Sequence, residues 1–319
     1  MIGRSEHVAY KDILSGIPVL ESRPIPGFTK YPDFRGTIVN PDLEEQLFLL
    51  RPPSEEATNR RGIRVLADTS RIIDGERQLI GHLANYDEVL PDGAQIFELP
   101  VTRAWGNNLE LVSHLARQHR VIQIRGGKHV GQSIAPLGLL DNSSAHIDGD
   151  YDDRADQIDL KLIQTALDHP EIFLDATCRG FQLVLAHLLG LLPEEVPNHR
   201  SAPGDPATIH QITNVVKKLY GPHAPVALRT LHQFDVNSYH MQGFRLEMIE
   251  PHLDVLKENG FYVTHVSQED EVVEMLFRLN KRGEVSGLLK QFHPEKMKGN
   301  PVGDLFIAWQ KEAIRRAVL

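Results

Sequence analysis

The feature that most constrains the fold is an alternation of short apolar segments with amphipathic segments from Gly62 onward. Apolar runs such as residues 63–67 and 121–124 predict buried strands, and the apolar spacing within residues 109–118 predicts a helix. This alternation predicts a mostly parallel sheet that is covered by helices on both faces. The expected strands are 63–67, 94–99, 121–124, 172–176, 235–239, 262–266 and 288–292, and the expected helices are 76–86, 109–118, 157–167, 181–189, 251–259 and 305–317.

The first sixty-one residues differ in character from the rest of the chain. Seven of the 20 prolines lie at or before Pro53, and no strong periodicity extends over this region. Such a composition predicts an extended arm or an irregular cap. We therefore divide the chain into a proline-rich N-terminal arm or cap, residues 1–61, and one folded domain, residues 62–319. Within the arm we expect one short element near residues 43–50.

Charge and hydropathy argue against several classes of partner. The net charge is −9 at pH 7 and the lysines and arginines are scattered, which disfavours binding to nucleic acid and to anionic lipid. No apolar run is long enough to cross a bilayer, and the N-terminus lacks the apolar core of a signal peptide. A single cysteine cannot form an internal disulfide, which fits a reducing compartment, so we expect a cytoplasmic location.

That cysteine, Cys178, lies where a strand-like apolar segment ends and a helical segment begins. At such a turn the sulfur projects above the sheet, and the free N–H groups of the following helix favour a thiolate. Gly180 leaves room for a tight turn, as in the nucleophile elbows of serine enzymes. The alternative is a small buried apolar residue, because free cysteine is among the most buried residue types.

A cysteine nucleophile needs a base and a group that orients the base. Among 16 histidines, His293 follows an expected strand, so we expect it at the same carboxyl edge of the sheet. In an extended segment Glu295 points to the same side as His293 and can hydrogen-bond the imidazole. The alternative is a surface loop in which the sequence His-Pro-Glu occurs by chance.

Two glycines follow the expected strand at residues 121–124. Gly126 and Gly127 offer backbone N–H groups of the kind that a tetrahedral oxyanion needs, and glycine permits close approach. The stretch 126–133 resembles a phosphate-binding loop, but Gln132 replaces the required lysine and Pro136 follows where a helix has to continue. We therefore exclude a nucleoside-triphosphate site.

Five short motifs occur along the chain in a fixed order. They are Gly126-Gly127, Asp156 with Asp159, Cys178-Arg179-Gly180-Phe181-Gln182, Val236-Asn237-Ser238-Tyr239-His240, and Phe292-His293-Pro294-Glu295. Together they resemble the class I glutamine amidotransferase-like superfamily, and most of all its γ-glutamyl hydrolase branch, which includes enzymes that cleave γ-glutamyl-γ-aminobutyrate. The resemblance extends over about residues 63–317. It implies a flavodoxin-like three-layer α/β sandwich with a central, mostly parallel sheet.

The resemblance also implies a cysteine-dependent hydrolase that cleaves a γ-glutamyl amide bond through a γ-glutamyl thioester. It implies that the catalytic residues are Cys178, His293 and Glu295. Backbone N–H groups of Gly126 or Gly127 and of Arg179 would form the oxyanion hole. The pocket for the small-molecule substrate would be lined by Gln182, Asn237, Ser238, Tyr239 and His240. We expect no cofactor and no metal.

Several alternatives stay open from the sequence alone. One alternative function is a glutaminase subunit that supplies ammonia to a separate synthase partner. Another is a binding protein that has kept the fold without the activity. Arg179 either bridges surface carboxylates or shapes the pocket, and Gln182 either packs or lines the pocket. The amine leaving group, and the choice between a homo-oligomer and a synthase partner, are also open.

Overall fold

The computed structural model describes residues 63–73, 76–79, 89–91, 94–101, 109–127, 130, 153–200, 208–229 and 231–318, together with three short strands before them. These three strands form a small antiparallel sheet with the order β1-β2-β3. Their bounds are Val19–Glu21 for β1, Gly36–Val39 for β2 and Leu47–Leu50 for β3. The element expected near residues 43–50 corresponds to β3, whereas the division of the chain at residue 61 stays a prediction.

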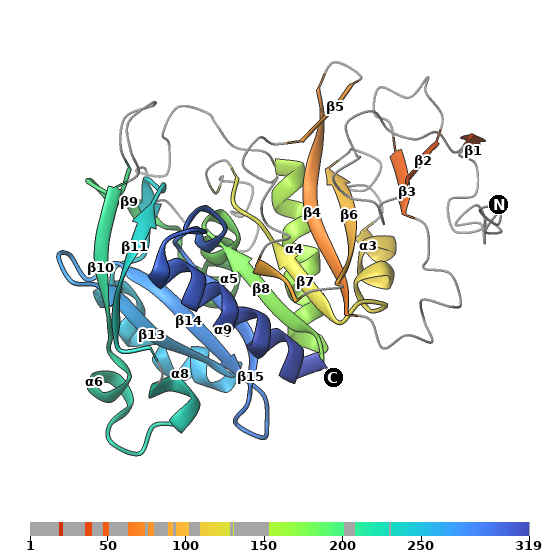
Figure 1. Cartoon of the computed structure of the whole chain (residues 1–319). Coiled ribbons are helices and arrows are strands. Elements are labelled where there is room, and N and C mark those ends of the chain that lie inside the picture. The colour runs from red at the N-terminus through yellow and green to blue at the C-terminus, as the bar shows by residue number, and fades with distance from the viewer. Residues whose placement is uncertain are drawn as a thin grey trace.

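Among the described residues the main sheet has ten strands, and five of them run parallel in the order β6-β4-β7-β8-β15 (Figure 1). The predicted α/β fold with a central sheet and flanking helices is confirmed. The register aligns Ile124 of β7 with Ala176 of β8, and Thr177 of β8 with Lys290 of β15. These three strands therefore end at one edge. The parallel strands are β4 (Arg64–Ile73), β6 (Gln95–Val101), β7 (Val121–Ile124), β8 (Phe173–Thr177) and β15 (Val285–Lys290).

Beyond β15 the sheet continues with antiparallel strands in the order β14-β13-β10-β11. At the other side, β5 pairs antiparallel with the far end of β4. A separate two-stranded sheet joins β9 to β12. The bounds are β5 (Glu76–Leu79), β9 (Glu194–Glu195), β10 (Thr208–Asn214), β11 (Gln233–Ser238), β12 (Gln242–Gly243), β13 (Phe261–Ser267) and β14 (Val273–Leu279).

Helices cover both faces of the main sheet. Leu174 and Ala176 of β8 join the apolar core that includes residues of α3, α4, α5 and α8, whereas Phe173 joins the core that contains residues of α6 and α9. Figure 1 shows α9 in front of the sheet and α4 and α5 behind it. The helices are α3 (Leu109–Ala116), α4 (Asp153–Asp168), α5 (Arg179–Leu189), α6 (Val216–Tyr220), α7 (Leu246–Ile249), α8 (Leu253–Glu258) and α9 (Pro301–Val318), with the 3-10 helices η6 (Val226–Arg229), η7 (Glu250–His252) and η8 (Pro294–Lys296).

One predicted helix is wrong in its first part. The prediction placed a helix at 76–86, but Glu76–Leu79 is the strand β5, and residues 80–86 lie outside the described residues. The pairing of Ile73 with Glu76 leaves only Asp74-Gly75 between β4 and β5, and this dipeptide favours two-residue hairpins. Local hairpin chemistry and pairing with β4 therefore outweigh the helical spacing.

Two strands of the antiparallel part, β10 and β14, were not predicted. Every residue of β14 is buried, although the strand carries Glu274 and Arg278. These charges interrupt the apolar run that marks a buried strand in a sequence. Within the part of the chain that the structure describes, no helix is both long and apolar enough to span a bilayer.

Candidate active site

The single cysteine lies at a strained turn between β8 and α5. Cys178 has φ 53° and ψ −112°, a region that residues with side chains rarely adopt. Its backbone N–H donates to the carbonyl of Lys290 at the end of β15, 2.7 Å away. A Cβ atom on Gly180 would lie 2.5 Å from the carbonyl oxygen of Ile124, so only glycine fits there. This turn has the geometry of a nucleophile elbow.

The predicted base and its partner lie just beyond β15, at the same edge. His293 Nδ1 lies 2.6 Å from Glu295 Oε1, and both side chains are buried. The Cys178 side chain hydrogen-bonds the same imidazole and acts on its charge. The structure thus brings together the three residues that the motifs singled out, although 115 positions separate Cys178 from His293 in the sequence.

The contacts with Glu295 and Cys178 change the pKa of the His293 imidazole. Burial alone lowers the pKa of His293, but the charges of Glu295 and Cys178 and their hydrogen bonds outweigh burial and raise the pKa to about 9. Burial raises the pKa of Glu295, and the contact with His293 outweighs that effect and holds this pKa below its usual value. At neutral pH the site therefore holds a charged imidazolium next to an ionised carboxylate.

A buried ion pair lies beneath the elbow, and no sequence pattern had indicated it. The ammonium of Lys290 contacts the carboxylate of Asp175, and neither side chain is exposed. Gln123 Nε2 and Gln310 Nε2 donate to Asp175 Oδ2 over 3.1 and 3.3 Å. Lys290 also lowers the pKa of Glu295, although burial and His293 act on that group more strongly. This cluster links β7, β8, β15 and α9 directly under the site.

The Asn237 side chain holds the backbone of His293, and a role in lining the substrate pocket stays a prediction. Its Nδ2 donates to the His293 carbonyl over 2.9 Å, and the His293 N–H donates to its Oδ1 over 2.8 Å. The side chain is buried. Both hydrogen-bonding groups of this amide are therefore used to hold the predicted base in place.

Tyr239 lies on the active-site side. Its ring centre is 5.5 Å from that of His293, in an edge-on arrangement, and Lys296 Nζ is 3.8 Å from the Tyr239 ring centre. Lys296 is close enough to Glu295 and Cys178 for their charges to act on its pKa. The motifs had not singled out Lys296, which follows Glu295 directly in the sequence. Burial lowers the pKa of Lys296, and the charges of Glu295 and Cys178 act against that effect.

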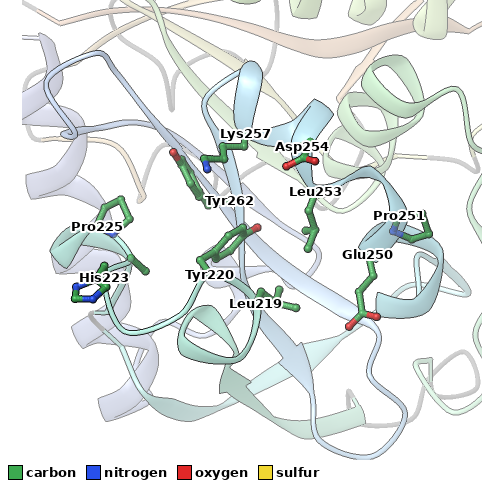
Figure 2. Close-up of a pocket in the computed structure, with 11 residues that line it drawn as sticks. Leu219, Tyr220, His223, Pro225, Glu250, Pro251, Leu253, Asp254, Lys257 and Tyr262 are labelled. Atoms are coloured by element: carbon green, nitrogen blue, oxygen red, sulfur yellow. The ribbon is translucent and has the colours of Figure 1, made fainter.

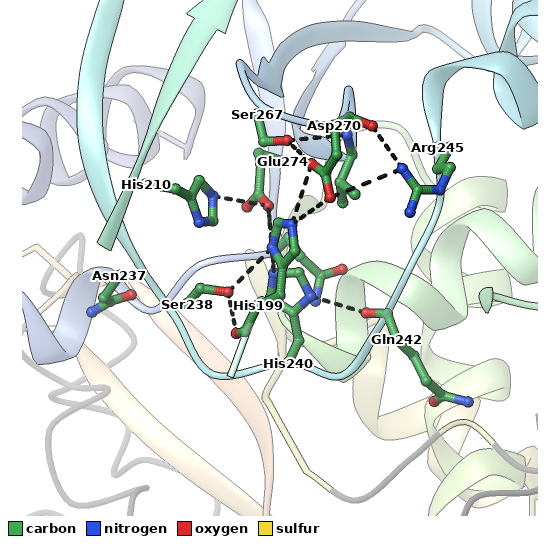
Figure 3. A network of polar contacts seen from close by, with 12 residues as sticks. His199, His210, Asn237, Ser238, His240, Gln242, Arg245, Ser267, Asp270 and Glu274 are labelled. Carbon is green, nitrogen blue, oxygen red and sulfur yellow. Dashed lines mark hydrogen bonds and ion pairs between the residues drawn. The ribbon is translucent and has the colours of Figure 1, made fainter. Parts of the chain in front are cut away.

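The side chains of Ser238 and His240 belong to a different cluster of polar residues, shown in Figure 3. Ser238 Oγ donates to the carbonyl of His199 over 2.5 Å, and His240 Nε2 lies 3.2 Å from His199 Nδ1. Residues two apart in an extended segment share a side, so Ser238 and His240 point away from the side that Asn237 and Tyr239 occupy.

The Gln182 side chain is buried and hydrogen-bonds to other groups of the protein. Its Nε2 donates to the carbonyl of Gln242 over 2.6 Å and to Gln291 Oε1 over 3.3 Å. Of the two alternatives for this residue, the geometry favours packing, because it ties α5 to β12. A direct role in substrate binding stays a prediction.

Arg179 bridges two carboxylates, as one of its alternatives expected, but these carboxylates are buried. Its guanidinium contacts Asp156 Oδ1 and Asp159 Oδ2, each over 2.5 Å, and both acids come from α4. The arginine side chain also packs against the loop after β7, since a Cβ on Gly127 would lie 3.2 Å from its Cδ. The ion pairs therefore fix the first turn of α5 behind the elbow.

The loop after β7 lies beside the elbow. Ile124 of β7 pairs with Ala176 of β8. Gly126 comes two positions after Ile124 and is followed by Gly127, and Cys178 comes two positions after Ala176. An oxyanion hole formed by these glycines and the Arg179 N–H stays a prediction.

A separate pocket of about 650 Å³ lies away from these residues (Figure 2). Its lining comes from α6 and the loop after it, from η7 and α8, and from Tyr262 at the start of β13. Tyr220 is fixed there because its hydroxyl accepts a hydrogen bond from the Val263 N–H over 2.9 Å. None of the predicted site residues lines this pocket.

Comparison with known proteins supports this fold. Among solved structures, 48 chains match, and one of them is the Trypanosoma brucei CTPS glutaminase domain with bound acivicin. It matches with a TM-score of 0.50 and 11% identity, over 80% of this chain and 94% of that chain, so the likeness shows the fold. No curated protein matches the sequence.

The fold and the motifs define a member of the class I glutamine amidotransferase-like superfamily. A family model for peptidase C26 matches residues 98–295, which is more than half of the chain. The chain therefore belongs to the peptidase C26 family and is an enzyme of the cysteine-dependent amidotransferase or hydrolase type.

Proposed function

We propose that this enzyme hydrolyses a γ-glutamyl amide bond, with Cys178 as the nucleophile. The observation that carries the proposal is the convergence at one sheet edge of a thiol on a strained turn and a buried imidazole–carboxylate pair. A nucleophile, a base and an orienting acid within reach of one another form the set that covalent acyl transfer needs.

In the first half of the reaction, the Cys178 sulfur attacks the γ-carbonyl carbon and a C–S bond forms. The carbonyl electrons move to the oxygen, where N–H groups of Arg179 and of Gly126 or Gly127 receive the negative charge. As the C–N bond breaks, the imidazolium of His293 donates its proton to the departing amine. The products of this half are a free amine and a γ-glutamyl thioester on Cys178.

In the second half, neutral His293 accepts a proton from a water molecule that attacks the thioester carbonyl. The C–S bond breaks, glutamate leaves, and the thiolate–imidazolium pair is restored. Glu295 holds the ring through Nδ1 in both halves, over 2.6 Å, and leaves Nε2 to exchange protons. Each catalytic cycle therefore consumes one water molecule and needs no cofactor.

We place the charged end of the glutamyl group near Tyr239 and Lys296. The ammonium of Lys296 lies beside the nucleophile and attracts a carboxylate, while the Tyr239 ring forms one side of the approach to His293. The binding site would then select substrates that carry a free α-carboxylate.

The test is a panel of γ-glutamyl amides, glutamine and one amide that lacks the α-carboxylate. Released amine is measured for the wild type and for Cys178→Ala. We expect the wild type to cleave at least one γ-glutamyl amide and to cleave the carboxylate-free amide poorly, and we expect the variant to cleave none. Equal release by both proteins on every substrate would end the hydrolase proposal. Ammonia release from glutamine that exceeds all other release, and that rises with an added synthase, would favour a glutaminase subunit instead.

A further inference from the structure

Four side chains that the proposed reaction does not use meet in an enclosed cluster (Figure 3). They are His199, His210, His240 and Glu274, and all four are buried. They come from the loop after β9, from β10, from the residues after β11 and from β14. The chain thus brings three imidazoles and one carboxylate together from four separate segments.

Ligand atoms of His199, His210 and Glu274 lie close enough together to hold a small cation, and His240 lies beside this group. His210 Nε2, His240 Nε2 and His199 Nδ1 lie 3.2, 3.4 and 3.6 Å from Glu274 Oε1. His199 Nδ1 and His240 Nε2 lie 3.2 Å apart. In a tetrahedral zinc site with bonds of roughly 2.0 to 2.1 Å, ligand atoms are separated by about 3.3 Å.

In His199 and His240, the ring nitrogen that points away from Glu274 (the outer nitrogen) has a partner that indicates where the proton is. His199 Nε2 faces the carboxylate of Asp270 over 3.0 Å, and His240 Nδ1 faces the carbonyl of Gln242 over 3.0 Å. Both partners only accept hydrogen bonds, so these outer nitrogens are the ones that donate. In the neutral rings, the inner atoms, His199 Nδ1 and His240 Nε2, are therefore lone-pair acceptors.

These inner acceptors face one another and the carboxylate of Glu274, and His210 Nε2 lies 3.2 Å from the same carboxylate. The Ser238 hydroxyl does not supply one, because its single proton goes to the His199 carbonyl. Among the described residues, neither oxygen of Glu274 and neither nitrogen of His210 makes a hydrogen bond of acceptable geometry. Buried acceptors in this arrangement repel each other unless a positive charge lies between them, and either a metal ion or a proton on His210, 3.2 Å from Glu274 Oε1, would supply it.

We propose that His199, His210, His240 and Glu274 bind one divalent transition metal, with Zn²⁺ as the ion that fits best. His199, His210 and Glu274 form the core of the site, and His240 Nε2, 3.4 Å from Glu274 Oε1, would be the fourth ligand. Imidazoles and a carboxylate suit zinc, and four protein ligands without an open position are typical of a structural site. Asp270 and the Gln242 carbonyl orient two of the rings, as outer partners do around metal-bound histidines. From the sequence we expected no metal, and these four residues have no recognisable ligand spacing in it.

The metal site would stabilise the segment after β11, which lies next to the candidate active site, without taking part in the reaction. Its ligands lie on β10 and β14, after β11 and in the loop after β9. Ser238 and His240 are neighbours of Asn237 and Gln242, which contact His293 and Gln182. Metal binding would therefore fix this segment in place, whichever substrate the enzyme cleaves.

The test measures metal directly, so its result does not depend on the proposed reaction. The full chain is produced without a polyhistidine tag in medium that contains Zn²⁺, and its metal content is measured by inductively coupled plasma mass spectrometry. We expect about one zinc per chain. The stripped protein should then bind Co²⁺ with the strong visible absorption of a four-coordinate ion, and added Zn²⁺ should abolish that absorption.

Variants locate the ion. Glu274→Gln keeps the shape of the side chain but removes its charge, and His210→Ala removes one ligand, so each should lower metal affinity at least tenfold. His265→Ala changes another buried histidine in the neighbouring strand β13 and should keep the metal. Cys178→Ala should also keep it, which excludes metal held by the active-site thiol. Circular dichroism of each variant shows whether it has folded.

Three outcomes would overturn the proposal. The first is a wild-type protein with less than a tenth of an equivalent of metal that binds neither Zn²⁺ nor Co²⁺ after stripping. The second is full metal content in folded Glu274→Gln and His210→Ala. The third is loss of the metal in Cys178→Ala, which would place the ion at the nucleophile.

Discussion

At the scale of single residues, the site is built by positions that tolerate few substitutions. Cys178 adopts a positive φ, and such strain costs roughly 1 to 3 kcal/mol when the surrounding structure enforces it. The hydrogen bond to Lys290 and the close approach of Ile124 to Gly180 hold that turn. His293 and Glu295 lie two residues apart and share a 2.6 Å contact.

The charge of Glu295 should set the alkaline limit of activity. His293 with a pKa of about 9 keeps the proton that the leaving amine needs, so kcat/KM should fall as the pH rises through about 9. Glu295→Gln removes the largest effect that raises this pKa, so the fall should move to lower pH. The rate at neutral pH should also drop on the order of 100-fold. The pH profiles of both proteins check this, and superimposable alkaline limbs would contradict it.

Gly180 should be irreplaceable for a steric reason. A Cβ there would lie 2.5 Å from the Ile124 carbonyl oxygen, and backbone cannot move aside as a side chain does. Gly180→Ala should lower the free energy of unfolding by about 1 to 3 kcal/mol, as overpacking in a core does.

The matched control for that substitution is Gly127→Ala. Its Cβ would lie 3.2 Å from Arg179 Cδ, a side-chain atom that has to shift by only a few tenths of an ångström, so a loss well below that of Gly180→Ala is expected. Urea unfolding of both variants makes the comparison. Equal losses would show that the close contact at Gly180 does not matter.

At the scale of elements, the parallel part of the sheet could be predicted and the antiparallel part only in pieces. Short apolar runs before Cys178 and before Gly126 marked β8 and β7, and the helices after them have clear apolar spacing. β14 was not predicted because Glu274 and Arg278 interrupt its apolar run. β5 was not predicted because its apolar residues are spaced as in a helix. The catalytic motifs could be predicted, but pairings such as Asp175 with Lys290 depend on tertiary contacts.

Contacts between elements suggest a positioning role for one predicted pocket residue. Asn237 at the end of β11 makes two hydrogen bonds to the backbone of His293. Asn237→Ala should therefore lower kcat about tenfold or more and change KM little, because the base loses its fixed position. Steady-state kinetics on a cleaved substrate measures both constants. Asn259→Ala, which changes an exposed side chain bonded to the Val255 carbonyl, is the control. A rise in KM with unchanged kcat would support the original pocket-lining prediction.

At the scale of the whole molecule, the site links folding stability to pH. His293 has a pKa of about 9 in the folded protein and about 6.5 in an unfolded chain. Below about pH 6.5 both the folded and the unfolded chain hold the His293 proton, so the full stabilisation by the charged imidazole is present there. As the pH rises toward about 9, only the folded state keeps the proton, and the stabilisation is lost.

This linkage predicts a pH-dependent difference between the wild type and His293→Ala. The free energy of unfolding should differ by about 1 to 3 kcal/mol more near pH 6 than above pH 9. Denaturant titrations across this range provide the values. His114→Ala, which changes an exposed histidine, should show no such trend. A difference that does not vary with pH would mean that His293 is not paired in the folded state.

The central claim is that His293 activates Cys178, and the alkylation rate of that thiol tests it most directly. Cys178 is the only cysteine, so iodoacetamide labelling followed by intact mass reports on it alone. At neutral pH we predict that the wild type is labelled at least about tenfold faster than His293→Ala, since the imidazolium stabilises the thiolate. Equal labelling rates in the two folded proteins would contradict the account.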